Sequence, residues 1–351
     1  MVRTLIQIDP VIYQDAELLS KSRDLVSKYS SHFNSNILVS GASGMLGEYI
    51  ATCLATFKAI NGFAGKIYIL ANHPSPFLVY MLKHFPAQIV RVQDLQLLSS
   101  LEISTFYKSD GMSSNPNSWS NLKNLVESNT QNLLGYIDKL ATKDFRLVLF
   151  STGEHYGDAK VIPTPENYYS HIDSLNPLSI YSGIKLASEL IAINASIFLD
   201  IKLTILRIFA TFGPGVRLND KRIFGQVMNS ALNGQDFILE SDGLARRTFL
   251  YSYDLLTAIL VAGQIDKFQT YNVGGESDVS ILEFLNLASE LLKFQVSDAR
   301  QTRNNSLSFH RGSPDISKIK TLGWKPVIPL SLSLQKTFES LVWRKNQHLL
   351  Q

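Results

Sequence analysis

The chain has 351 residues, of which 45% are hydrophobic and 18% charged, and its formal net charge is +3. This length suffices for one large or two moderate domains, and the lack of a long basic run argues against a dedicated nucleic-acid binder. No apolar run approaches the roughly 18 residues that cross a bilayer, and the acidic residues soon after Met1 do not fit a signal peptide. Because Cys53 is the single cysteine, no intramolecular disulfide can form, and we expect a cytoplasmic protein without a membrane partner.

Strand-like and helix-like runs alternate along most of the chain. Residues 1–34 look like a helical cap whose role the sequence leaves open. The expected strands are 37–39, 66–70, 88–92, 103–107, 145–151 and 202–209, and the expected helices are 46–60, 76–84, 119–141 and 181–199. This alternation predicts an α/β fold, a Rossmann-like doubly wound parallel sheet covered by helices on both faces.

The alternation loosens after position 212, where loop-like stretches are interleaved with short helices such as 281–292. We therefore expect a dinucleotide-binding domain over 35–212 and a smaller, mixed α/β substrate-binding lobe over 213–351. The lobe would close over the carboxyl ends of the strands, where doubly wound sheets bind their ligands.

A glycine-rich turn, GASGMLG at 41–47, joins the first strand to the first helix. The first turn of a helix leaves backbone N–H groups unpaired and carries the positive end of the helix dipole. A phosphate can approach these groups if no side chain blocks the way, which glycine ensures. The turn alone does not distinguish a dinucleotide site from an ordinary strand–helix junction.

Two further stretches carry candidate catalytic groups. In YSGIK, Tyr181 and Lys185 lie four apart and share one helix face, where an ammonium group favours the phenolate needed of a general base. Upstream, STGEHYGD follows a buried strand and places Thr152 and Glu154 at its carboxyl end. An exposed helix pair and a simple turn cap are the alternatives for these two stretches.

Together these motifs resemble the extended short-chain dehydrogenases/reductases, the NAD-dependent epimerase/dehydratase family of nucleotide-sugar epimerases, dehydratases and UDP-glucuronate decarboxylases. The resemblance runs from about residue 36 to about 330, with its motifs in family order. These are GASGMLG, STGEHYGD, NPLSIYSGIK, LRIFATFGPG, RRTFLYSYDLLTAI, YNVGG and PDISKIKTLGWKP.

The resemblance implies a role for each matching residue. The catalytic group is Thr152, Glu154, Tyr181 and Lys185, with Tyr181 taking a proton from a sugar hydroxyl. The cofactor contacts are Gly41, Ser43, Gly44, Met45, Leu46, Gly47, Asn72, Asp94, Leu95, Lys108, Tyr181, Lys185 and Ile208. Arg222, Arg247 and Arg311 would hold the nucleotide diphosphate of the substrate, and no metal site is indicated. Helices near 119–141 and 181–199 would pair two copies into a homodimer through a four-helix bundle.

The chain departs from the family pattern at several positions. The second strand ends in IYILANHPSP without the carboxylate that usually selects NAD, so NAD and NADP both stay open, with NAD preferred. TFYKSDG stands where the family commonly has His-x-Ala-Ala, which would bring Lys108 to the cofactor diphosphate. Ala210 replaces an asparagine that usually touches the substrate.

Gly153 replaces the aspartate that family 4,6-dehydratases carry before the glutamate, which disfavours elimination of water. The expected function is therefore modification of a nucleotide-linked sugar with bound NAD(P), through a transient 4-keto intermediate, of epimerase or decarboxylase type. The alternatives are an NADPH-dependent keto-sugar reductase, a 4,6-dehydratase, or a non-catalytic relative that binds a dinucleotide.

Overall fold

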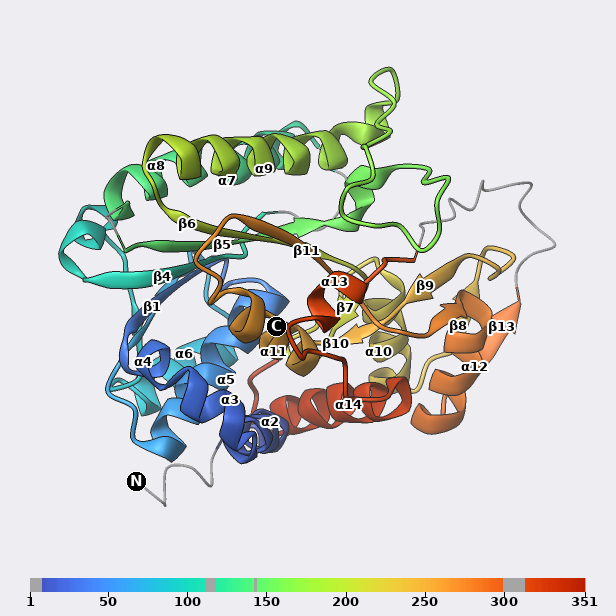
Figure 1. The fold of residues 1–351 in the computed structure, drawn as a ribbon. Coiled ribbons are helices and arrows are strands. Elements are labelled where there is room, and N and C mark those ends of the chain that lie inside the picture. Colours follow the sequence, from blue (N-terminus) through green and yellow to red (C-terminus); the bar gives the residue numbers. More distant parts are fainter. Residues whose placement is uncertain (1–7, 112–115, 117, 142–143, 299–312, 351) are drawn as a thin grey trace.

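The computed structural model describes residues 8–111, 116, 118–141, 144–298 and 313–350 (Figure 1). Its central element is a parallel sheet of seven strands in the order β11-β6-β5-β4-β1-β2-β3. These strands are β1 (Asn36–Ser40), β2 (Ile67–Leu70), β3 (Ile89–Arg91), β4 (Ile103–Lys108), β5 (Arg146–Thr152), β6 (Lys202–Ile208) and β11 (Gln269–Val273). The order reverses between β1 and β4, as in a Rossmann-like sheet, so the predicted fold class is confirmed.

Helices cover both faces of this sheet, because alternate residues of a strand point to opposite sides. Ile37 and Val39 of β1 join one apolar core, while Leu38 joins the other. Figure 1 shows α7 (Trp119–Asn129), α8 (Gln131–Leu140) and α9 (Ile180–Phe198) along one face. The other face carries α5 (Met45–Asn61), α6 (Pro76–His84) and α11 (Ser252–Ala262). Short 3₁₀ helices η1 (Leu95–Ser100), η2 (Gly153–Tyr156) and η3 (Pro177–Ser179) connect these elements.

One expected helix is in fact two. The stretch predicted as a single helix over 119–141 breaks at Thr130, whose backbone leaves the helical region with φ −120° and ψ −71°. The Thr130 hydroxyl donates to the carbonyl of Val126 at 2.7 Å, a local bond that competes with continued helix.

The smaller lobe is built around a third apolar core. Its helices are α10 (Ile223–Asn233), α12 (Ile281–Leu292) and α14 (Leu330–Asn346). Its short strands are paired as β7 (Thr211–Phe212) with β10 (Leu250–Tyr251), β9 (Arg246–Thr248) with β12 (Asp278–Ser280), and β8 (Phe237–Leu239) with β13 (Val296–Asp298). The short helix α13 (Ser317–Lys320) instead buries Ile319 in the core beneath the large sheet. The chain also returns from this range to supply β11 to the large sheet. The boundary predicted at residue 212 thus does not separate sheet strands from lobe strands, and the division into domains stays a prediction.

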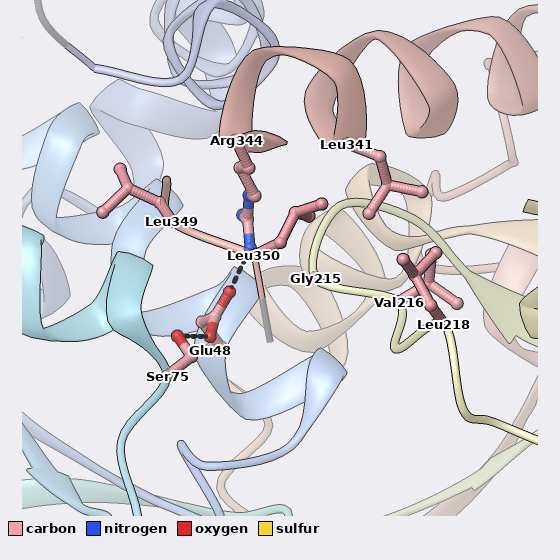
Figure 2. A pocket seen from close by; sticks show the side chains of 9 residues that line it. All are labelled: Glu48, Ser75, Gly215, Val216, Leu218, Leu341, Arg344, Leu349 and Leu350. Carbon is pink, nitrogen blue, oxygen red and sulfur yellow. Dashed lines mark hydrogen bonds and ion pairs between the residues drawn. The ribbon is translucent and has the colours of Figure 1, made fainter. Parts of the chain in front are cut away.

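The N-terminal segment is helical, with α2 (Pro10–Lys21), α3 (Arg23–Lys28) and α4 (Ser30–Asn34). It packs against α5 and α14 and is tied to them by buried charges. Arg344 of α14 forms ion pairs with Asp9 at 3.0 Å and with Glu48 of α5 at 2.6 Å. Glu48 in turn accepts a hydrogen bond from Ser75, which caps α6 (Figure 2). The segment whose role the sequence left open therefore anchors the helix that follows the glycine turn.

Removing the Arg344 guanidinium should destabilise the protein strongly. In Arg344→Met two carboxylates remain buried without their cation, which we expect to lower the free energy of unfolding by about 3–5 kcal/mol. Lys21→Met provides the matched control, because the Lys21–Glu17 pair lies on the surface and such pairs contribute little. Urea denaturation followed by circular dichroism measures both variants, and an equal effect of the two would contradict this role of Arg344.

Candidate active site

The glycine turn between β1 and α5 uses its three glycines in different ways. Gly41 has φ +69°, and a Cβ added to it would lie 2.5 Å from the Cα of Asp110. A Cβ on Gly47 would lie 2.5 Å from the carbonyl oxygen of Gly41. At Gly44 the nearest atom would be 3.3 Å away. The outer glycines therefore allow close packing within the protein, while Gly44 keeps the helix end free of a side chain.

The start of α5 has the features of an anion site. Gly44 is the N-cap residue, and among the described residues no side chain caps the first turn. Met45 is buried and Leu46 is half-buried behind it. Backbone N–H groups at such a helix end attract phosphate. The predicted cofactor residues of this turn are thus placed together.

Ser43 holds the turn to its surroundings. Its hydroxyl accepts a hydrogen bond from the backbone N–H of His73, just after β2, at 3.3 Å. Its carbonyl accepts from the guanidinium of Arg217, which follows β7 and was not identified from the sequence. The turn is therefore fixed between the end of β2 and the smaller lobe.

The other predicted contacts of the adenosine half lie at neighbouring strand ends. Asn72 is exposed just after β2. Asp94 follows β3 and accepts from the N–H of Gln96 at 2.9 Å, which makes it the N-cap of η1. Leu95, the first residue of η1, is 40% exposed. These residues lie at one edge of the sheet, and their contacts with a cofactor stay predictions.

The end of β4 holds a buried ion pair. Lys108 is 1% exposed, and its Nζ lies 2.8 Å from Oδ1 of Asp110 and donates to the carbonyl of Ser128 at 2.7 Å. Asp110 also accepts from the hydroxyl of Ser40. The Lys108 charge is therefore balanced within the protein, and its predicted approach to a cofactor diphosphate stays a prediction.

The four predicted catalytic residues gather at the carboxyl end of β5. Thr152 is buried, and its hydroxyl accepts from the N–H of Glu154 at 3.2 Å. Glu154 is half-buried in η2, and its carbonyl accepts from Ser182 of α9 at 3.2 Å. Tyr181 is buried in the first turn of α9. These bonds attach the start of α9 to the strand end that carries Thr152.

Lys185 is held by a hydrogen bond to the strand that carries Thr152. Its Nζ donates to the carbonyl of Phe150 in β5 at 3.1 Å. Burial, and then the nearby charge of Lys108, lowers the pKa of Lys185 from its ordinary value to about 8. Its ammonium form therefore predominates below pH 8, where it can stabilise negative charge.

A second buried cluster, missed by sequence reasoning, lies behind the catalytic strand end. Glu189 of α9 accepts from Ser151 and forms an ion pair with Arg207 of β6 at 2.8 Å. Nε2 of His155 lies 3.5 Å from the same carboxylate, and burial lowers the pKa of His155 to about 4, so the imidazole is neutral. Glu189 comes four residues after Lys185, a helical spacing that could have revealed it.

Gly153, which separates Thr152 from Glu154, is covered by an aromatic ring. A Cβ added at Gly153 would lie 2.1 Å from the ring of Phe209, which follows β6. The ring is also stacked with Tyr156 at 6.4 Å between centroids. A larger residue at 153 would have to displace Phe209, so the structure leaves no room there for an aspartate.

The three predicted substrate arginines differ in their surroundings. Arg222 binds Asp220 through Nε at 3.0 Å and lies over the ring of Phe224. Asp220 lines an open groove of about 1030 Å³ beside α10 and β8. Arg247 is half-buried in β9 and donates to the carbonyl of Arg246 at 2.6 Å. Arg311 lies outside the described residues, and the diphosphate roles stay predictions.

Ile208 ends β6 beside the catalytic strand. Its Cα pairs with Thr152 on one side and with Val273 on the other. Ile208 therefore lies at the same sheet edge as Thr152, and its contact with a cofactor stays a prediction. Ala210, two residues further, is half-buried.

A family model decides the relationship that these motifs suggested. The model of the NAD dependent epimerase/dehydratase family matches residues 37–274, more than half of the chain. The chain belongs to this family. The match spans the sheet, the glycine turn and the Tyr181–Lys185 helix, so the expected resemblance is confirmed.

Curated relatives within the epimerase/dehydratase family include sugar-nucleotide decarboxylases. The chain is 29% identical over 240 residues to UDP-glucuronic acid decarboxylase 1 of Xenopus tropicalis. The aligned stretch covers 68% of this chain and 56% of that relative. It is 27% identical over 312 residues to UDP-glucuronic acid decarboxylase 6 of Arabidopsis thaliana, covering 86% and 88% respectively. The chain thus spans little more than half of the vertebrate protein and most of the plant one.

Solved structures of epimerase/dehydratase proteins share the fold. The UDP-glucose 4-epimerase of Thermotoga maritima matches 89% of this chain and 99% of its own with a TM-score of 0.72 and 20% identity. The UDP-glucuronic acid 4-epimerase of Bacillus cereus, in complex with UDP-glucuronic acid and NAD, matches 88% and 99% with a TM-score of 0.71 and 20% identity. At this identity the likeness shows the fold alone.

A nicotinamide dinucleotide, the cofactor in the name of this family, fits the residues at the glycine turn and at Lys185. Gly44 has no side chain over the start of α5, where a Cβ would lie 3.3 Å from the carbonyl oxygen of Gly41. The first turn of α5 has no side-chain cap among the described residues. Gly44 and the α5 N-terminus would hold the diphosphate, and Lys185 the nicotinamide end. No helix in the described residues combines the length and apolarity needed to span a bilayer.

Dinucleotide affinity should fall as the pH rises through about 8. Above the pKa of Lys185 the neutral amine no longer attracts the negatively charged ligand, so the dissociation constant should rise by up to about tenfold per pH unit. Titration calorimetry between about pH 7 and about pH 9.5 measures this dependence. Lys185→Met should bind more weakly than the unaltered protein below pH 8, approach it at higher pH and show no slope, and an unchanged slope in that variant would assign the titration to another group.

Proposed function

We propose that this protein oxidises a hydroxyl of a nucleotide-linked sugar through a transient 4-keto intermediate and then completes a decarboxylation or an epimerisation. The observation that carries this proposal is the attachment of α9 to the end of β5. Through Ser182 and Lys185 it brings Tyr181 to the same sheet edge as Thr152 and Glu154. The glycine turn for the dinucleotide lies at the carboxyl end of β1 in the same parallel sheet.

Each side chain has a definite task in this reaction. Tyr181 accepts the proton of the sugar hydroxyl, and Lys185 stabilises the resulting phenolate by its charge. Thr152 orients the hydroxyl by hydrogen bonding. When bound, the dinucleotide accepts a hydride from the same sugar carbon and returns it later.

We favour decarboxylation of a nucleotide-linked hexuronic acid, because the relatives named above are UDP-glucuronic acid decarboxylases. A ketone at C4 stands β to the C6 carboxylate. The C5–C6 bond can therefore break, with carbon dioxide leaving and the electron pair passing into the carbonyl to form an enolate. Glu154 is the carboxyl group placed to position the substrate or to return a proton to C5.

Elimination of water is disfavoured by the packing of Gly153. A 4,6-dehydratase needs an acid and a base beside the threonine, and Phe209 fills the space in which the first of them would stand. A 4-epimerase would use Tyr181, Lys185 and Thr152 in the same roles. It differs in that the keto sugar rotates in the site, so that the hydride returns to its opposite face. It is the second candidate, and structures of that class share the fold.

Mass spectrometry of products tests the proposal. The purified protein is incubated with UDP-glucuronic acid, UDP-glucose and UDP-N-acetylglucosamine, each with NAD⁺ and with NADP⁺. We expect loss of carbon dioxide from UDP-glucuronic acid, whereas an isomer of unchanged mass would indicate the epimerase. A parallel incubation with NADPH tests the reductase, which would consume the reduced cofactor. Glu154→Gln should still oxidise the sugar but accumulate reduced cofactor and keto intermediate and stall before product, while Glu17→Gln serves as the surface control. No conversion of any nucleotide sugar would contradict the proposal.

We further propose that two copies pair through α7, α8 and α9, as the family resemblance implies. Apolar side chains on these helices are exposed in the single chain, with Trp119 at 75%, Leu190 at 53% and Ile197 at 69%. Burying them against a second copy would remove this apolar area from water. A monomer mass in light scattering at micromolar concentration would contradict this.

A further inference from the structure

The corner after β2 lacks the group that usually selects NAD. In dinucleotide folds the adenosine ribose lies at the end of the second strand, where an Asp or Glu binds its 2′-hydroxyl. Here β2 is followed by Ala71, which is buried, and by Asn72 and His73, which are exposed. The next carboxylate along the chain is Asp94, which is engaged with the N–H of Gln96. The three residues that directly follow β2 therefore carry no carboxylate that would repel a 2′-phosphate.

A guanidinium occupies this corner instead. Arg91 is the last residue of β3, and its Cα pairs with Ile69 of the adjacent β2. Its Nη2 donates to the carbonyl of Asn72 at 3.1 Å, which holds the guanidinium against the loop that follows β2. Its Nε is buried and has no hydrogen-bond partner among the described residues. The side chain is thus anchored at one nitrogen and retains unused donor capacity.

We propose that Arg91 reads the 2′ position of the adenosine ribose and that this chain binds NADP(H) in preference to NAD(H). A guanidinium donates two parallel hydrogen bonds to a phosphate, an interaction that a 2′-hydroxyl cannot match. This inference rests on the proposed function, because it assigns the specificity of the same dinucleotide site. It also separates this chain from the NAD that names its family.

Binding measured without substrate tests the assignment. Titration calorimetry of the purified, cofactor-stripped protein with NADP⁺, NAD⁺ and 2′,5′-ADP should show NADP⁺ bound at least about tenfold tighter than NAD⁺. Arg91→Met should weaken NADP⁺ and 2′,5′-ADP by about 10- to 100-fold, the range for losing a charge-assisted pair, and change NAD⁺ by less than about threefold. Arg23→Met is the control, because Arg23 is exposed on α3 away from the sheet ends.

A second variant keeps the test decisive if Arg91→Met folds poorly. Asn72→Asp places a carboxylate on the exposed loop that follows β2 and should reverse the preference, with NAD⁺ gained and NADP⁺ repelled. Tighter binding of NAD⁺ by the unaltered protein, or equal weakening of both dinucleotides in Arg91→Met, would overturn the assignment to Arg91 while leaving the proposed function intact. Failure to bind either dinucleotide would overturn both.

Discussion

The buried carboxylate of Glu189 is the contact on which the catalytic edge of the sheet depends. It joins three elements, since it accepts from Ser151 of β5, pairs with Arg207 of β6 and belongs to α9. Arg207 extends the connection to Tyr156 of η2, whose hydroxyl bonds Asn272 of β11 at 2.8 Å. Because a buried charge without its partner is costly, the set holds together as a unit. Ser151 directly precedes Thr152, and Glu189 lies one helical turn after Lys185, so this set adjoins the catalytic residues on both elements.

Departures from the family pattern are accommodated by local compensation. Gly153 gives up a side chain, and the ring of Phe209 fills the space. Lys108 brings a charge into the buried end of β4, and Asp110 neutralises it. The backbone of Asp110 also packs directly on Gly41, so the glycine turn and the altered β4 end depend on one another. These changes reshape the site while the Tyr181–Lys185 helix keeps its attachment.

The sequence predicted the regular framework well because apolar periodicity and motif order determine it. The helix at 281–292 has the expected bounds, and α5 differs from its prediction by one residue at each end. Side-chain pairing was harder to predict. Nothing near Lys108 in sequence indicated that the backbone carbonyl of Ser128 in α7 would accept a hydrogen bond from its ammonium group, and Arg344 meets Glu48 from the opposite end of the chain. Such partners depend on three-dimensional packing, which spacing does not encode.

The most direct test of the account is pre-steady-state reduction of the bound nicotinamide with UDP-glucuronic acid, compared between the unaltered protein and Tyr181→Phe. If Tyr181 is the general base, the variant should lose roughly 100- to 10,000-fold in the rate of sugar oxidation. Its dinucleotide affinity should stay within about threefold, since the glycine turn and Lys185 are unchanged. Nicotinamide reduction at a near-normal rate in Tyr181→Phe would contradict the account.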